Sequence, residues 1–139
     1  MDIRYARSET ELSRCFPVMV QLRPHLSQAE FINRVLQQRQ EGYQLVYVQA
    51  EDGVKAVAGF RIQNLLAHGR ILYVDDLVTD ASSRSQSYGK QLITWLHEQA
   101  QAQGCSSLQL DSGVQRADAH RFYFREGLVI TSFRFVKPL

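Results

Sequence analysis

The stretch ILYVDDLVTDASSRSQSYGKQL, from Ile71 to Leu92, decides the fold. Its first half is apolar and typical of a buried strand, and a polar turn then leads into the start of an amphipathic helix. Mostly small side chains fill the turn from Arg84 to Gly89, where the helix begins. Free backbone N–H groups and the positive end of the helix dipole meet at such a place. The stretch therefore predicts an anion-binding loop between a strand and a helix.

Length and composition are those of one ordinary globular domain. The chain has 139 residues, of which 45% are hydrophobic and 22% charged, enough to bury a core. The net charge of +2 is small and the basic residues are scattered along the chain, which argues against nucleic acid as a partner. The charged first residues and the lack of a long apolar run favour a cytoplasmic protein that binds no membrane. Cys15 and Cys105 are expected to be reduced thiols, and the histidines do not recur at metal-ligand spacing.

Capping boxes and turn residues predict the element order β-α-α-β-β-β-α-β-α-β. Ser8 with Glu11 and Ser27 with Glu30 are typical of helix starts. The turn Glu51-Asp52-Gly53 predicts a hairpin between two strands. The order indicates a mixed sheet with helices on its faces, of the α/β or α+β type. The expected strands are residues 2–7, 43–49, 54–63, 71–79, 107–110 and 128–136, and the expected helices start at residues 8 and 27 and cover about 88–103 and 117–125.

Asp75 and Asp76 interrupt an apolar strand, and such a strand normally carries no charge. Successive residues of a strand point to opposite faces, so one carboxylate is expected on each face of the sheet. An unpaired carboxylate inside a sheet costs several kcal/mol, on the order of known desolvation penalties. At least one of the two is therefore expected to border a cavity.

Two motifs in the second half resemble those of the GNAT superfamily of N-acetyltransferases, and the element order also matches. The family's cofactor loop, Q/R-x-x-G-x-G/A after a strand, is similar to Arg84-Ser85-Gln86-Ser87-Tyr88-Gly89, with Ser87 at the usual first glycine. The family's late segment, A-x-x-F-Y-x-x-x-G-F, is similar to AHRFYFREGL, residues 119–128. The resemblance spans nearly the whole chain. It implies one N-acetyltransferase domain over residues 1–139, with a mixed, mostly antiparallel twisted sheet of six to seven strands and about four helices.

The resemblance implies acetyl-CoA as acyl donor and no metal. Backbone N–H groups of Ser85 to Lys90 would hold the pyrophosphate, and the backbone of Leu77 to Thr79 would pair with the pantetheine arm like an added strand. Serine has no easy access to positive φ, so the turn at Ser87 is expected to use ordinary dihedral angles. The alternative is that the serines only cap the helix. The expected cofactor-binding residues are Leu77, Val78, Thr79, Arg84, Ser85, Gln86, Ser87, Tyr88, Gly89 and Lys90.

The resemblance also implies catalytic roles. Tyr123 would be the general acid that protonates the leaving thiolate, because a phenol with a pKa near ~10 keeps its proton at neutral pH. Polyamine-acetylating members carry a similar acidic pair in I-Y-L-E-D-F-F-V. Asp75 is therefore expected to be the base or to hold a water, and Asp76 to contact the amine or form a salt bridge. Asp111, at the end of a strand, is expected to line the substrate site. The alternative for Asp75 and Asp76 is that backbone groups and neighbouring arginines satisfy both carboxylates, without a catalytic role. The alternative for Tyr123 is an ordinary helix tyrosine with its hydroxyl at the surface.

Three functional hypotheses follow. The first is direct acetyl transfer from acetyl-CoA to a primary amine, preferably of a small molecule, with the acceptor pocket shaped by residues 24–36 and 65–70. The second is a GNAT-fold module that binds coenzyme A or a partner without turnover. The third is a docking protein that uses the expected last strand, Leu128 to Val136, as an exposed edge. Family members often dimerise, so a homodimer is compatible with all three.

Overall fold

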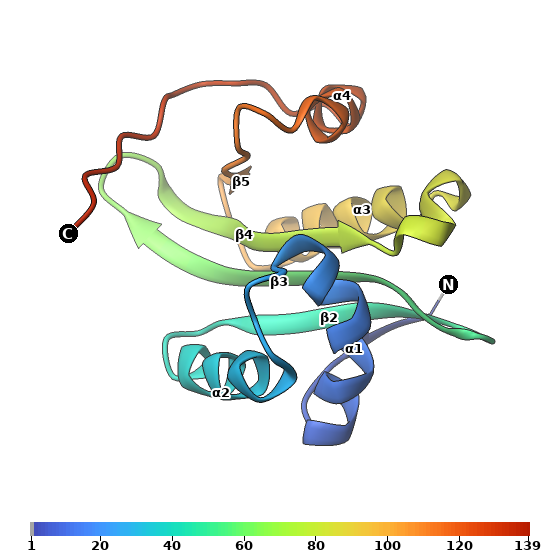
Figure 1. Cartoon of the computed structure of the whole chain (residues 1–139). Helices are drawn as coiled ribbons and strands as arrows, with labels where there is room; N and C mark the ends of the chain where they lie inside the picture. The colour runs from blue at the N-terminus through green and yellow to red at the C-terminus, as the bar shows by residue number, and fades with distance from the viewer. Residues whose placement is uncertain (1) are drawn as a thin grey trace. The chain divides into compact units, whose positions relative to one another are not determined.

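The computed structural model describes residues 2–139, which form two compact parts divided between Gln109 and Leu110 (Figure 1). The first part holds nearly all of the sheet, and the second holds one helix and the C-terminal segment. The prediction of a single domain over residues 1–139 stays a prediction. The strands are β1 (Ile3–Tyr5), β2 (Gln44–Ala50), β3 (Gly53–Leu65), β4 (Gly69–Thr79) and β5 (Ser107–Leu110); the helices are α1 (Glu9–Leu22), α2 (Gln28–Arg39), the 3-10 helix η1 (Ala81–Gln86), α3 (Tyr88–Ala102) and α4 (Ala117–Arg125).

Local sequence signals set the starts of the first two helices as predicted. The backbone N–H of Glu11 donates to the Ser8 hydroxyl over 3.1 Å, and the Glu11 carboxylate accepts from the Ser8 N–H over 3.0 Å. Ser27 and Glu30 form the same reciprocal pair before α2. Each capping box satisfies backbone donors that a helix cannot satisfy by itself.

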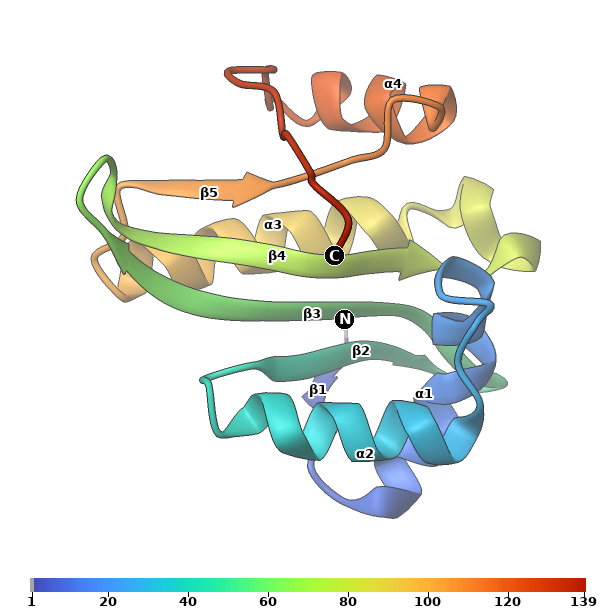
Figure 2. The same ribbon diagram turned by 60° about the vertical axis from the view of Figure 1, so that its left-hand side comes forward.

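The sheet has the strand order β1-β2-β3-β4-β5, and the three pairings from β1 to β4 are antiparallel. Helices α1 and α2 cover one face and α3 covers the other (Figures 1 and 2). Side chains of β3 point alternately to the two faces of the sheet. Val57 belongs to the core beneath α1 and α2, whereas the ring centre of Phe60 lies 5.9 Å from that of Trp95 on α3. The predicted apolar face of α3 is buried, namely Leu92, Ile93, Leu96 and Ala100.

Strand β5 begins beside the beginning of β4, because the Ser106 N–H donates to the Arg70 carbonyl over 2.8 Å. The two strands run in the same direction (Figure 2). Since β5 is only four residues long, it reaches along the first residues of β4 and no further. The last residues of β4, Leu77 to Thr79, pair with β3 on one side and have no strand partner on the other among residues 2–139.

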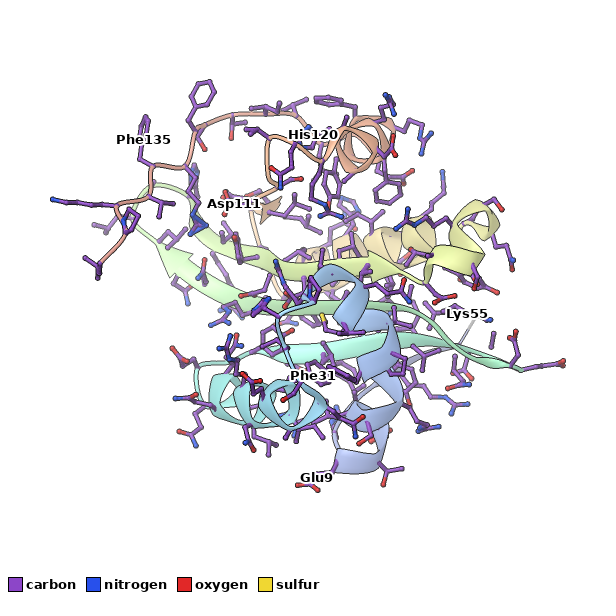
Figure 3. All side chains as sticks on the ribbon, viewed as in Figure 1. Glu9, Phe31, Lys55, Asp111, His120 and Phe135 are labelled. Carbon is purple, nitrogen blue, oxygen red and sulfur yellow. The ribbon has the colours of Figure 1, made fainter. Side chains whose placement is uncertain are left out.

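The second part contains α4, as predicted, but the expected strand from Leu128 to Val136 is absent and that prediction is wrong. The sheet therefore has five strands, not six to seven. Alternating apolar residues give a segment β propensity, but a strand exists only where its backbone joins a ladder. This segment joins none in the described chain, and its large side chains stay exposed; Phe135, labelled in Figure 3, is 94% exposed.

Candidate active site

A β-bulge in β4 brings both carboxylates to the same face of the sheet. Gly59 pairs with Asp76 and Phe60 pairs with Val74, so Asp75 is an extra residue without a partner on β3. A bulge shifts the alternation of side chains by one residue. The prediction that Asp75 and Asp76 point to opposite faces is therefore wrong. Both side chains bond groups on the α1–α2 side.

Asp76 is held by two donors from separate parts of the chain. The Arg23 Nε donates to its Oδ1 over 2.9 Å, and the Tyr43 hydroxyl donates to its Oδ2 over 2.7 Å. Arg23 also donates to the carbonyl of Asp75 over 3.0 Å. Tyr43 is only 3% exposed, and burial together with the charge of Asp76 raises the pKa of its phenol well above the usual value. Tyr43 therefore stays protonated and serves as a permanent donor.

Asp75 is paired with Arg61 of β3 through both oxygens. The Arg61 Nε lies 3.1 Å from Oδ1, and Nη2 lies 3.0 Å from Oδ2. Burial raises the pKa of Asp75, and the neighbouring charge of Asp76 raises it further, although Arg61 opposes both effects. The result is a carboxylate that is more basic than an ordinary aspartate. Asp75 thus combines a fixed orientation with the capacity to accept a proton.

Gly59 makes room for this arrangement. A Cβ atom at Gly59 would lie 1.8 Å from the Tyr43 hydroxyl and 2.3 Å from the ring carbon that bears it. Only glycine lets the buried phenol cross β3 and reach Asp76. The glycine in an otherwise apolar strand was the signal in the sequence for this irregularity. Nothing in the sequence pointed to Tyr43, Arg23 or Arg61 as the partners.

A pocket of about 240 Å³ opens beside Asp76. The α1–α2 connection and the inner side of α2 supply most of its wall, and this includes the segment 24–36 that was expected to shape an acceptor pocket. Phe31, labelled in Figure 3, forms part of the apolar wall. Asp75 is not in the lining. The pocket is lined by Met19, Arg23, His25, Leu26, Phe31, Arg34, Val35, Gln38, Tyr43 and Asp76.

The segment before α3 forms a tight connection with one unusual backbone conformation. Residues 81–86 form η1, which the sequence did not predict, and Ser87 joins η1 to α3 with φ 65° and ψ 19°. The expectation of ordinary dihedral angles at Ser87 is therefore wrong. Ser87 adopts the left-handed conformation, which glycine reaches without strain and other residues reach at a cost of about 1–2 kcal/mol.

The start of α3 has the features of an anion site. Ser87 occupies the N-cap position, but its side chain makes no capping hydrogen bond, which argues against the alternative that the serines serve only as caps. The first backbone bond of the helix runs from the Gln91 N–H to the Ser87 carbonyl. The amides of Tyr88 and Gly89 precede it and have no intrahelical acceptor. Ser87 and Gly89 place little side-chain volume next to these donors, so the segment fits a phosphate group.

Tyr123 and Asp111 lie in the second part of the chain. Tyr123 is on α4, with its ring centre 5.6 Å from that of Phe122. Asp111 accepts a hydrogen bond from Arg134 over 2.9 Å, which occupies the carboxylate that was expected to line the substrate site. The structure thus brings Asp75 and Asp76 together. The roles of Tyr123 and Asp111 stay predictions.

Cys15 is not placed to act as a nucleophile, and neither thiol belongs to a metal site among the described residues. Cys15 is buried, and burial raises the pKa of its thiol to about 12, so it carries its proton at neutral pH. Within residues 2–139, no group of three or more His, Cys, Asp or Glu side chains is placed to hold a metal ion. None of the described helices has the length and apolar character that a membrane span requires.

Residues 7–127 match the model of the Acetyltransferase (GNAT) family. The chain belongs to the GNAT family. It is 34% identical to an uncharacterized N-acetyltransferase of Bacillus subtilis, YhdJ, over 100% of this chain and 99% of that protein. It is 41% identical, over 48% of this chain and 43% of the relative, to an aminoalkylphosphonate N-acetyltransferase of Salmonella typhimurium. A solved acetyltransferase of Trypanosoma brucei matches with a TM-score of 0.79 and 26% identity, and the match covers 99% of both chains.

Membership of the GNAT family makes this protein an acetyltransferase, and acetyl-CoA is the donor in the family generally. The family assignment made from the two sequence motifs is thereby confirmed. The cytoplasmic location and the homodimer stay predictions.

Proposed function

We propose that this GNAT protein transfers the acetyl group of acetyl-CoA directly to a primary amine of a small molecule. One observation carries the proposal: two carboxylates share one face of β4, and one of them lines a pocket of about 240 Å³. An amine with a pKa near ~10 arrives protonated and must lose a proton before it can attack a thioester. A carboxylate pair beside a pocket supplies both attraction for the ammonium group and a base.

The two aspartates divide this work. Asp76 lines the pocket and is held in place by the Arg23 and Tyr43 donors, so its carboxylate would receive the ammonium group of the acceptor. Asp75 accepts the proton, directly or through a water, because burial raises its pKa above that of an ordinary aspartate. The amine nitrogen then forms a bond to the acetyl carbon, which gives a tetrahedral intermediate, and the carbon–sulfur bond breaks as this intermediate collapses. Tyr123 donates its proton to the leaving thiolate, and the second proton of the amine nitrogen restores the phenol, directly or through water.

The donor would be held mainly by backbone groups. Acetyl-CoA supplies an acetyl group activated as a thioester. The amides of Ser85 to Lys90 would bind its pyrophosphate, with Arg84 as a nearby cation, and the open edge at Leu77 to Thr79 would pair with its pantetheine arm. The left-handed Ser87 supports this role, because it gives the loop the conformation that a glycine would otherwise provide.

A small acceptor is favoured by the size of the pocket. A volume of about 240 Å³ suits a molecule of few heavy atoms better than a protein segment. The relative named for aminoalkylphosphonates, small primary amines, also supports an acceptor of this kind. No observation favours a protein lysine or N-terminus in its place.

Two measurements test this function together. Thermal unfolding with acetyl-CoA, coenzyme A and ATP should show stabilisation by both coenzyme A species and little by ATP, with about 2.7 kcal/mol added at 100 times the Kd. Release of free coenzyme A thiol should then depend on an added primary amine. Stabilisation without release, across a panel of small amines, would favour the rival binding module. No stabilisation by either species would contradict the donor assignment.

A further inference from the structure

We propose that the acceptor carries an anionic group as well as its amine, and that Arg34 at the rim of the pocket binds this anion. The inference rests on the proposed function, since it takes the pocket beside Asp76 as the acceptor site. The predicted substrate class is a small zwitterion: an aminophosphonate, aminophosphate or amino acid. Simple alkylamines and polyamines fall outside it.

The charges that line the pocket are unbalanced. Its lining contains two arginines and one carboxylate. Arg23 is paired with Asp76 over 2.9 Å, so this guanidinium already has an anionic partner. Arg34 makes no hydrogen bond or salt bridge within the described residues. The Arg34 guanidinium on α2 is therefore the lining cation without an ion-pair partner in the described part of the chain, in a pocket that Asp76 also lines.

Glu30, an acid one turn before Arg34 on α2, forms no salt bridge with Arg34 among the described residues. Its hydrogen bonds with Ser27 lower the pKa of the Glu30 carboxyl, and the charges of Arg34 and His25 lower it further. That carboxylate is engaged in the capping box, where it accepts from the Ser27 N–H over 3.3 Å. Glu30 is not part of the pocket lining. The pocket thus offers an anion one guanidinium with a free hydrogen-bonding fork.

Two further lining residues supply donors beside Arg34. The Gln38 Oε1 accepts from Arg61 over 2.7 Å, which leaves the two amide hydrogens of Gln38 as donors. His25 is exposed at the same pocket and adds a ring N–H. A diamine would place its second ammonium group against this donor set. The pocket therefore discriminates against polyamines by repulsion as well as by lost contacts.

The test compares four probe amines with the wild-type protein and two variants. The probes are 2-aminoethylphosphonate, β-alanine, n-propylamine and putrescine, and the readouts are acceptor KM, kcat and direct calorimetric binding. Arg34→Gln removes the proposed anion ligand. Arg4→Gln is the matched control, because Arg4 lies on β1, pairs with Asp2 and does not line the pocket.

We expect the wild-type protein to prefer the two anionic amines, 2-aminoethylphosphonate and β-alanine, and the comparison of these two shows which anion fits better. Arg34→Gln should raise the KM for both by roughly 10-fold to 100-fold and leave the KM for acetyl-CoA unchanged. The difference in KM between the anionic amines and n-propylamine should therefore become smaller. Arg4→Gln should match the wild type.

Three results would overturn the proposal. If n-propylamine or putrescine is the best acceptor, the anion site is wrong while amine acetylation stands. If Arg34→Gln alters acetyl-CoA KM instead of acceptor KM, the cation serves the donor. If acetyl-CoA binds but no probe is acetylated, the missing turnover contradicts the proposed function. The anion site is then judged by calorimetry alone, and equal binding of the zwitterions to the wild type and to Arg34→Gln contradicts it.

Discussion

Two of the irregular points in the first part of the chain, the bulge of β4 and the turn at Ser87, are stabilised in opposite ways. At the bulge of β4, side chains from distant segments converge: Arg23, Tyr43 and Arg61 all bond to Asp75 or Asp76. At Ser87, a left-handed residue leads into a helix that no side chain caps. The first point is satisfied within the protein, whereas the amides of Tyr88 and Gly89 at the second have no intrahelical acceptor. In the proposed function, the acceptor end therefore depends on side-chain identity, and the donor end depends on backbone shape.

The largest expected effect is the loss of acceptor turnover when Asp75 is replaced. Asp75→Asn should lower kcat/KM for the acceptor by 100-fold or more at neutral pH, because it removes the proposed base. In the wild type, kcat/KM should rise as pH increases through the pKa of Asp75, which lies above its ordinary 3.8. The variant should lack this rise. A pH profile with the same acidic limb in both proteins would assign the base elsewhere.

Crowding the bulge should damage stability instead. Gly59→Ala places a methyl group against the buried Tyr43 phenol and displaces its bond to Asp76. The free energy of unfolding should fall by about 2–4 kcal/mol, from overpacking together with a lost charge-assisted hydrogen bond. Denaturant titration measures this loss. The double variant Gly59→Ala with Tyr43→Phe should lose less than the sum of the two single changes, and strict additivity would show that the two sites do not interact.

At position 87, stability should depend on whether the residue adopts positive φ easily and little on the chemistry of its side chain. Ser87→Gly is expected to be more stable than Ser87→Ala by about 1 kcal/mol, because only glycine adopts positive φ without strain. Both variants should keep the acceptor KM of the wild type, since Ser87 does not line the pocket. Equal stability of the glycine and alanine variants would show that the left-handed turn at Ser87 carries no strain.

The smallest effect concerns the pH dependence of stability. The pKa of Asp75 is raised in the folded protein, so its protonated form favours folding, and this contribution is lost as pH rises through the folded pKa. Stability of the wild type relative to Asp75→Asn should therefore decline between pH 3.8 and neutrality. Asp52, whose pKa is lowered by Lys55, provides the opposite control. The wild type should gain stability over Asp52→Asn as pH rises, and slopes of one sign in both pairs would contradict the electrostatic account.

The same contrast explains what the sequence predicted. Capping boxes, the hairpin turn and the face of α3 depend on residues close together in the chain, and all of them were predicted correctly. The position of the carboxylates was also evident, because charge within an apolar strand needs a cavity or a partner. That the two carboxylates share one face could not be predicted, since a bulge depends on the register of β3 against β4. The prediction of a strand from Leu128 to Val136 was wrong for a similar reason, because alternating apolar residues do not by themselves supply a neighbouring strand.

The most direct test of this division is a calorimetric titration of acetyl-CoA into the wild type and Asp75→Asn, combined with turnover of an accepted amine by both. We predict dissociation constants for acetyl-CoA within about twofold of each other, together with the 100-fold loss of turnover expected when a general base is removed. Loss of acetyl-CoA affinity in parallel with turnover, or full turnover by the variant, would contradict the assignment of separate donor and acceptor ends.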